Sequence, residues 1–292
     1  MLLVLLGVSQ LLLTCLLLFT PLWFWVLFGW FLYLTLYFYL DDGPMHGRRS
    51  WTHFKRLSLW KSVSPIRFVY TNREAIETLQ SPCLFVVMPN LSNMALVYGF
   101  GWNGGTVPMP VLRNGQPRSC VYLLPRLLFY IPFLRDWLLW SGAVANRGYD
   151  SILDHINAGQ CVAYNPCGME ELFLMERGKL IIKAAGHDIF QFARDNNIHI
   201  VPVLVYGEQE RYYMYRNTPW QRWSYRMCEW PFPFWVFPRI FGQGPPPPLR
   251  LFVGNPMNPS LHEKDEAFYN LFYGAIKGMN NVGSDQALEI KE

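Results

Sequence analysis

The stretch CLFVVMPNLSNMALVYGFGW (residues 83–102) sets the expectation for the fold. Its first part, Cys83 to Met88, is a short continuous apolar run, and the turn residues Pro89 and Asn90 follow it. A run of this length bounded by a turn is typical of a buried β-strand, and working residues often follow the ends of such strands. The turn itself contains no obvious nucleophile or base.

Similar short runs alternate with helical patterns along the rest of the chain. Strands are predicted at residues 66–70, 83–88, 120–123, 160–164, 198–206 and 249–253, and helices at 72–80, 127–140, 150–158 and 181–196. This alternation predicts an α/β domain with a mainly parallel central sheet and flanking helices. Working residues of such a sheet lie at the carboxyl ends of its strands, here residues 88–90, 165–170 and 206–210.

The N-terminal segment is strongly apolar and carries no charged residue before Asp41. Residues 2–20 and 22–40 flank Pro21, and each would form a helix about 28 Å long, close to the thickness of a hydrocarbon core. The length and the uncharged start favour a retained anchor over a cleaved signal. Pro21 is compatible with two spanning helices and with a hairpin in one leaflet. A basic cluster beyond the anchor predicts that the next domain faces the cytosol: Arg48, Arg49, Lys55 and Arg56.

Composition narrows the class of protein. The chain of 292 residues is 51% hydrophobic and 16% charged, with a net charge of +4. This mild, scattered charge does not suggest nucleic-acid binding, whereas it suits an anionic membrane surface or an anionic cosubstrate. The six cysteines form no C-x-x-C pair, which favours reduced thiols over a disulfide framework or a zinc site. We expect no metal and no resident cofactor.

Three segments follow from this pattern. Residues 1–40 are expected to form the membrane anchor, residues 41–279 the cytosolic-facing domain, and residues 280–292 a disordered tail. Within the domain, residues 212–248 are crowded with aromatic side chains, prolines and interspersed arginines. That mixture predicts a surface lying in the headgroup region of a membrane.

Several motifs occur in a characteristic order. They are DDGPMHGRRSWTHFKRLSLWK (41–61), FYIPFLRDWLLWSGAV (129–144), PCGMEEL (166–172), VPVLVYGEQE (201–210) and PPPPLRLFVGNPMNP (245–259). Together they resemble the type-2 diacylglycerol acyltransferase family, which includes monoacylglycerol and wax-alcohol acyltransferases. The resemblance implies an endoplasmic-reticulum membrane enzyme that moves a fatty acyl group from acyl-CoA, a cosubstrate, to a lipid hydroxyl. It implies membrane lipids as partners, and a homo-oligomer or an active relative is a further expected partner.

The family's H-P-H-G motif is replaced here by MPNL (88–91). Acyl transfer from a thioester needs the acceptor hydroxyl to lose its proton, and a histidine suits that task. Met88 cannot accept a proton, and Asn90 can only donate hydrogen bonds to a substrate or an oxyanion. Three hypotheses remain open: a base has moved elsewhere, catalysis rests on positioning, or the chain is a degenerate member that binds lipid or regulates a partner.

Candidate site residues follow from the motifs. Asn90, Glu170 and His187 are the candidate catalytic residues; Glu170 occupies the acidic place of the G-G-A-x-E-[AS]-L motif, and His187 is the most interesting of six histidines. Glu171 is expected to cap a helix or to lie on the surface. The candidate substrate-binding residues are Arg135, Gly207 and Glu208.

Overall fold

The structure is a computed structural model. It describes residues 23–36, 42–47, 66–89, 93, 95–102, 107–112, 114–131, 134–167, 171–174, 179–208, 212–214, 218–228, 236–238, 249–261, 265–283 and 287–291.

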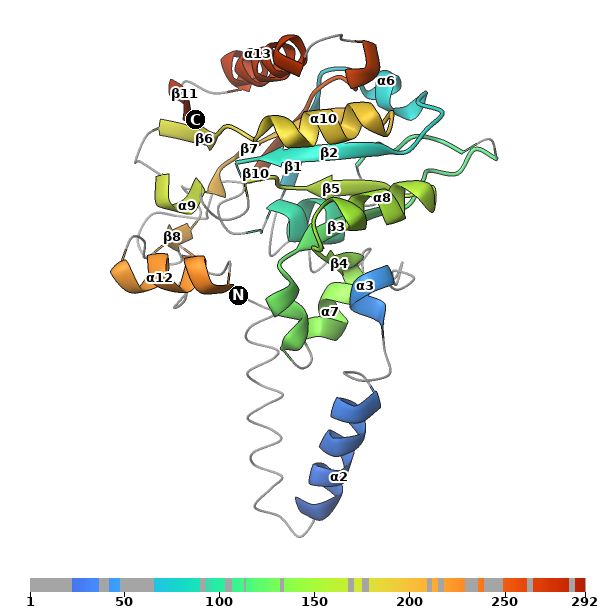
Figure 1. The fold of residues 1–292 in the computed structure, drawn as a ribbon, viewed down its shortest axis with the longest axis vertical. Coiled ribbons are helices and arrows are strands. Elements are labelled where there is room, and N and C mark those ends of the chain that lie inside the picture. Colours follow the sequence, from blue (N-terminus) through green and yellow to red (C-terminus); the bar gives the residue numbers. More distant parts are fainter. Residues whose placement is uncertain are drawn as a thin grey trace.

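A seven-stranded sheet forms the centre of the molecule (Figure 1). Its order across the sheet is β1 (Ile66–Tyr70), β10 (Leu249–Val253), β7 (His199–Tyr206), β2 (Cys83–Met88), β5 (Cys161–Tyr164), β3 (Cys120–Leu124) and β4 (Ala143–Ala145). The five strands from β7 to β4 are parallel, while β10 is antiparallel to β7 and β1 is parallel to β10. The predicted α/β fold with a mainly parallel sheet is confirmed.

Side chains alternate between two apolar cores, one on each face of the sheet. From β2, Phe85 and Val87 enter the first core, whereas Val86 and Met88 enter the second. All six residues of β2 are buried, as expected for a central strand covered on both faces. Helices on both sides therefore hold this strand, and the turn that follows it, in place.

The first core is covered by α6 (Arg73–Glu77), the π-helical segment η2 (Leu96–Trp102), the 3-10 segment η3 (Arg126–Tyr130) and α7 (Leu134–Ser141). The second is covered by α8 (Tyr149–Asn157), α10 (His187–Asp195) and α13 (Asp265–Gly283). Figure 1 shows α10 and α13 above the sheet and α7 below it.

Smaller elements complete the fold. They are α2 (Trp23–Leu34), α3 (Gly43–His46), α9 (Glu171–Leu174), β6 (Lys179–Lys183), β8 (Tyr212–Met214), α12 (Pro219–Cys228), β9 (Val236–Pro238), the 3-10 segment η4 (Pro259–Leu261) and β11 (Ala287–Lys291). Strand β6 pairs in parallel with β11, and β8 pairs in antiparallel with β9.

The predicted helix over 181–196 is wrong in its first part. Residues up to Lys183 belong to strand β6, and the helix α10 starts only after Gly186. The β-branched pair Ile181 and Ile182 favours an extended chain, and β11 supplies the partner strand. The predicted helix over 127–140 is also divided, into η3 and α7; the intervening Pro132 disfavours helical geometry in the residue before it.

The prediction of a disordered tail is wrong for most of residues 280–292. Helix α13 continues to Gly283, and β11 pairs with β6 along its whole length. Leu288 and Ile290 pack against the second core, which explains why this part of the tail is ordered.

The predicted membrane segment lies largely outside the described residues. Its described part includes α2, a helix of 12 residues none of which is buried. No helix among the described ranges combines the length and the apolar character needed to cross a bilayer.

Candidate functional site

The candidate site lies where three neighbouring parallel strands end. Met88 is in register with Leu204 of β7, and Val86 is in register with Tyr164 of β5. The carboxyl ends of β2, β5 and β7 therefore meet at one edge of the sheet, as the sequence predicted.

The turn after β2 begins with two buried residues. Met88 has no exposed surface and packs in the second core, and Pro89 is also buried after a cis peptide bond. A thioether in an apolar core has no proton to exchange at physiological pH. Asn90 and Leu91 lie outside the described residues, so the role predicted for Asn90 stays a prediction.

Glu208 connects the turn after β7 to the segment that follows β2. The residue is 3% exposed, and its Oε1 accepts a hydrogen bond of 3.1 Å from the backbone N–H of Ala95. Gly207, just before it, has φ of +93°, a value that favours glycine, and so lets the chain turn directly out of β7. Two of the three residues predicted to bind substrate, Gly207 and Glu208, thus lie at the expected edge, and Glu208 joins two of its turns.

The turn after β5 is held by a second buried carboxylate. Glu171 is fully buried, its Oε1 accepts from the backbone N–H of Lys183 at 3.2 Å, and its Oε2 accepts from Asn165 Nδ2 at 3.5 Å. Asn165 Oδ1 in turn accepts from the N–H of Cys167 at 2.7 Å. The surface position expected for Glu171 is therefore wrong: its side chain fixes the turn against β6. Glu170 lies outside the described residues.

Cys167 does not supply a thiolate to this site. Burial raises the pKa of its thiol well above the ordinary range, and Sγ donates to the Lys183 carbonyl at 3.2 Å. A neutral, hydrogen-bonded thiol is a poor nucleophile. Its bond to Lys183 adds to the contacts that join this turn to β6.

His187 is exposed at the first turn of α10. Its ring stacks on Tyr269 of α13, with the ring centres 4.6 Å apart. Asp188, the next residue, accepts a hydrogen bond from Tyr149 Oη at 2.6 Å. This bond joins the first turns of α8 and α10, and sequence reasoning missed it because no spacing rule connects residues 39 positions apart.

Arg135 lies on the opposite face of the sheet from His187. It is 2% exposed on α7, whose Leu138 and Leu139 enter the first core, whereas α10 enters the second. The next residue, Asp136, accepts from Tyr33 Oη of α2 at 2.7 Å. The structure therefore does not bring Arg135 and His187 together, and Arg135 is buried rather than solvated.

The other described histidines do not lie at the carboxyl edge of β2, β5 and β7. His155 of α8 is buried, and its Nδ1 lies 2.7 Å from Oε1 of Gln160, in the connection from α8 to β5. His199, at the amino end of β7, lies 3.2 Å from Ser81 Oγ, and burial lowers its pKa. His46 is exposed on α3. His53 and His262 lie outside the described residues.

Nothing in the described part of the chain gathers three or more His, Cys, Asp or Glu side chains into a group able to hold a metal ion. The nearest cysteine pair is Cys83 and Cys161, with sulfur atoms 3.8 Å apart in the first core. The described side chains at the site therefore act through hydrogen bonds, most of them to carboxylates.

The sequence match decides the family. Residues 15–237 match the model of the diacylglycerol acyltransferase family. The chain belongs to this family. Membership confirms the resemblance found in the motifs and supports an acyltransferase function, with an acyl donor and a lipid acceptor as substrates.

Two further comparisons complete the findings. The chain is similar in structure to the 1-acyl-sn-glycerophosphate (LPA) acyltransferase PlsC from Thermotoga maritima, with a TM-score of 0.48 and 14% sequence identity over 80% of this chain and 79% of that chain. No curated protein matches it in sequence.

Proposed function

We propose that the chain is a membrane-bound O-acyltransferase of the endoplasmic reticulum, which transfers a fatty acyl group from acyl-CoA to a lipid hydroxyl such as that of diacylglycerol or monoacylglycerol. The family match over residues 15–237 carries the proposal. The ordered carboxyl edge of β2, β5 and β7 supports it, because both Glu208 and Glu171 hold their turns in fixed positions there.

The reaction needs one proton acceptor. The acceptor hydroxyl oxygen forms a bond to the thioester carbon, its proton passes to a base, the carbon–sulfur bond breaks, and CoA leaves as a thiolate that then takes up a proton. Met88 has no group for this step, so we propose that Glu170 or His187 receives the proton and that Asn90 donates to the developing oxyanion. No cofactor takes part, since acyl-CoA supplies the acyl group.

Two exposed apolar surfaces support attachment to a membrane. On α2, aromatic side chains such as Trp25 and Phe31 are 66% and 64% exposed. On α12, Trp220 and Trp223 stack 4.8 Å apart, and both are exposed together with Met227. Apolar surface of this kind is normally buried against a partner or a bilayer.

Arginines on α12 suit the same membrane surface. Arg222 and Arg226 are exposed between the tryptophans and Met227. A helix with aromatic and basic side chains together binds best at the headgroup level of an anionic leaflet. We therefore propose that α12 lies on the cytosolic face of the membrane that holds the anchor.

A second function is favoured by one observation, the complete burial of Met88 in the apolar core. A side chain packed in this way stabilises the fold at the position where the family carries a catalytic histidine. The alternative is therefore a degenerate member that keeps the fold and the lipid site but binds lipid or regulates an active relative.

The test is ester formation from labelled acyl-CoA in membranes of a host that lacks its own acyltransferases. Diacylglycerol, monoacylglycerol and a long-chain alcohol are offered in parallel to the wild-type chain and to Glu170→Ala and His187→Ala variants. His46→Ala is the matched control, because His46 is also an exposed histidine but lies on α3.

The proposal expects ester with at least one acceptor, and a loss of about a hundredfold or more in one of the two variants but not in the control. Folded, membrane-bound wild-type protein that forms no ester with any acceptor would contradict it and leave the binding function.

A further inference from the structure

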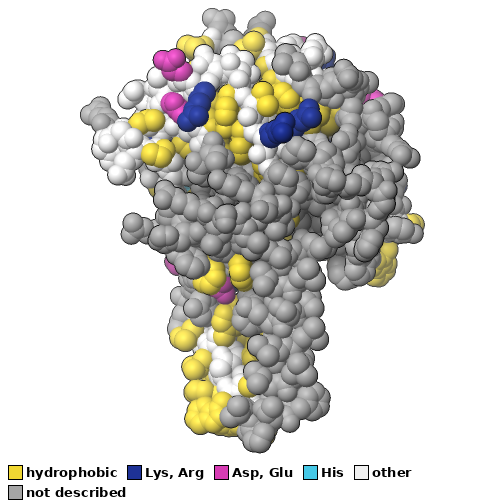
Figure 2. All heavy atoms as spheres, turned by 180° about the vertical axis from the view of Figure 1, so that it is seen from behind, with side chains coloured by type: hydrophobic (Ala, Val, Ile, Leu, Met, Phe, Trp, Pro, Cys, Tyr) yellow, Lys and Arg dark blue, Asp and Glu magenta, His cyan; other side chains and the backbone are white. Residues whose placement is uncertain are grey.

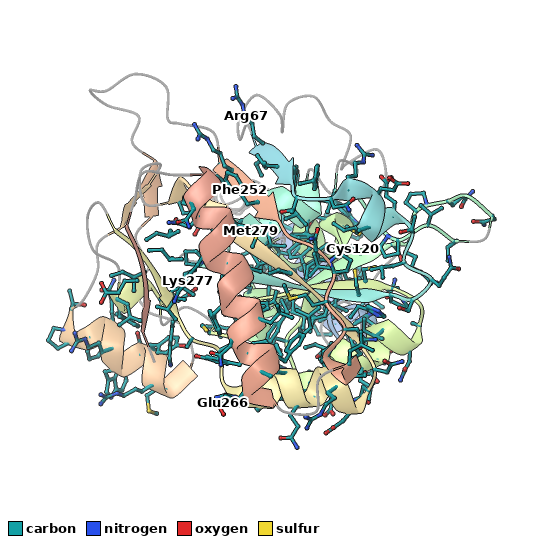
Figure 3. All side chains as sticks on the ribbon, turned by 90° about the horizontal axis from the view of Figure 1, so that it is seen from above. Arg67, Cys120, Phe252, Glu266, Lys277 and Met279 are labelled. Atoms are coloured by element: carbon teal, nitrogen blue, oxygen red, sulfur yellow. The ribbon has the colours of Figure 1, made fainter. Side chains whose placement is uncertain are left out.

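A cavity of about 360 Å³ lies between the edge of the sheet and α13. Apolar side chains from β1, β10, the loop after β10 and α13 line most of it: Val69, Phe252, Met257, Ala275 and Met279, with Gly278 beside them. Figure 3 labels Phe252 of β10 and Met279 of α13 near each other, where the helix passes over the sheet. The volume is near the lower limit of small-molecule sites, about 300–1,000 Å³, and so favours a ligand with one apolar chain.

Two arginines lie beside this cavity. Arg67 of β1 and Arg250 of β10 are direct register partners, and both are exposed. Each lies two residues before a cavity residue of its own strand, Val69 and Phe252, so the arginines share the cavity's face of the sheet about 7 Å away. Figure 3 shows Arg67 at the outer edge, next to Phe252.

The arginine pair has no acidic counterpart in the described structure. Neither Arg67 nor Arg250 forms an ion pair with a described residue, whereas the nearby Arg73 is paired with Glu77 at 2.7 Å. Like charges directly opposite each other on neighbouring strands destabilise a sheet. An anion held between the two guanidinium groups would remove that repulsion.

The cavity faces away from the membrane segment. Figure 1 places α13 and α2 at opposite ends of the long axis of the molecule. From behind, the upper part of the molecule shows hydrophobic side chains beside basic ones (Figure 2). With the N-terminal segment in the membrane, as proposed above, a ligand reaches this face from the aqueous side, which suits an amphiphile with a single chain better than a lipid with two.

We infer that this cavity is a binding site for a single-chain anionic amphiphile of the fatty-acid class, with its acyl chain between β1, β10 and α13 and its anionic head at Arg67 and Arg250. The site differs from the edge where β2, β5 and β7 end, and the inference goes beyond the proposed function; only the approach from the aqueous side rests on the proposed membrane placement. The anionic head is the carboxylate of a free fatty acid or the phosphates of acyl-CoA.

Two glycines of α13 offer a matched pair of variants that test where the acyl chain of the ligand binds. Gly278 and Gly274 lie one turn apart on α13, and a Cβ added at either meets nothing within 4 Å, but only Gly278 lines the cavity. Replacing either by leucine favours the helix to the same extent. Gly278→Leu fills the cavity and Gly274→Leu does not.

The experiment is photolabelling of the full-length chain in membranes with a fatty acid that carries a diazirine on its chain, followed by mapping of the labelled residues. We expect labelling at the cavity, a loss of about tenfold or more in Gly278→Leu, and no change in Gly274→Leu. An Arg67→Gln, Arg250→Gln double variant tests the site of the anionic head and should lose about tenfold in labelling. Lys277 is an exposed cation elsewhere on α13, and Lys277→Gln should leave the labelling unchanged.

Competition separates the sources of the ligand. Excess oleate that removes the label identifies a free fatty acid, excess oleoyl-CoA that does so at lower concentration identifies the thioester, and either result supports the site. Equal competition by oleyl alcohol, or labelling that Gly278→Leu leaves unchanged, would overturn it. A chain inactive in acyl transfer but labelled as expected would overturn the proposed function alone.

Discussion

The turns after β2 and β7 are neighbours at one edge of the sheet, but only the turn after β7 keeps the residues of the family motif. At the end of β7, Gly207 and Glu208 match the family motif, and the carboxylate holds the backbone of Ala95. At the end of β2, Met88 occupies the place of a family histidine and is fully buried in the core. The turn after β7 thus keeps its motif residues, whereas the turn after β2 carries methionine in place of a titratable side chain.

This difference teaches that position and chemistry are separable in an acyl-transfer site. Glu208 contributes to position, because a buried carboxylate that accepts a backbone N–H fixes a turn. The base contributes the proton transfer, worth about a hundredfold to ten-thousandfold in rate. A chain that keeps the first and changes the second is expected to bind its substrates well and to react slowly.

The largest expected effect comes from restoring the histidines. A Met88→His, Asn90→His double variant should raise ester formation by about a hundredfold or more, because it adds a histidine base at the turn after β2 to the slower proton transfer proposed for Glu170 or His187. Rates are measured in the acyl-CoA assay, with folding checked by thermal unfolding. A folded double variant that reacts no faster would show that a histidine at this turn does not add to the proton transfer of the natural chain.

The next effect is on stability. Glu171→Ala should lower the free energy of unfolding by about 3 kcal/mol, since it leaves the Lys183 N–H and the Asn165 amide without this acceptor. Chemical denaturation measures the loss, and Glu74→Ala on the exposed side of α6 is the control. If the two variants lose equal stability, the hydrogen bonds of Glu171 do not hold the turn.

Glu208→Ala should cost less, about 1–2 kcal/mol, because the cited bond involves one backbone donor. Glu208→Gln keeps an oxygen that can accept from Ala95 and should lose under half as much. The comparison with Glu171→Ala tests whether both turns are held by a buried carboxylate that accepts a backbone N–H. A Gln variant as unstable as the Ala variant would mean that the negative charge, and not the hydrogen bond, matters.

The smallest effect is a pH dependence from the other end of β7. Burial lowers the pKa of His199 in the folded chain, so the unfolded chain binds more protons once the pH falls below the ordinary value near 6.5. Stability from this residue is therefore complete above that pH and decreases below it. Thermal unfolding at pH 7.5 and 5.5 should show a smaller drop in a His199→Gln variant, and an equal drop would exclude this histidine as the cause.

The sequence predicted the elements that alternate most clearly. Strand β2 was predicted with its observed bounds, Cys83 to Met88, because a continuous apolar run between turns is typical of a central parallel strand. Helix α13 was missed although Phe268, Phe272 and Ile276 recur every four residues. Strand β6 was taken as helix, since its partner β11 lies more than 100 residues away and leaves no local signal.

The sequence predicted where the site lies but not the hydrogen bonds that hold it. Motif and strand ends placed Gly207 and Glu208 correctly at the carboxyl edge. The bond from Ala95 to Glu208 joins residues 113 positions apart, and the burial of Glu171 depends on β6 lying against its turn. Such contacts follow from tertiary packing, which neither spacing nor propensity contains.

The most direct measurement is the rate of ester formation by the wild-type chain, from labelled acyl-CoA, beside the Met88→His, Asn90→His variant in the same membranes. We predict ester from both, with the wild-type chain slower by about a hundredfold or more. Ester from the double variant and none from the folded, membrane-bound wild-type chain would contradict the proposed activity and establish that the natural chain has lost catalysis at this site.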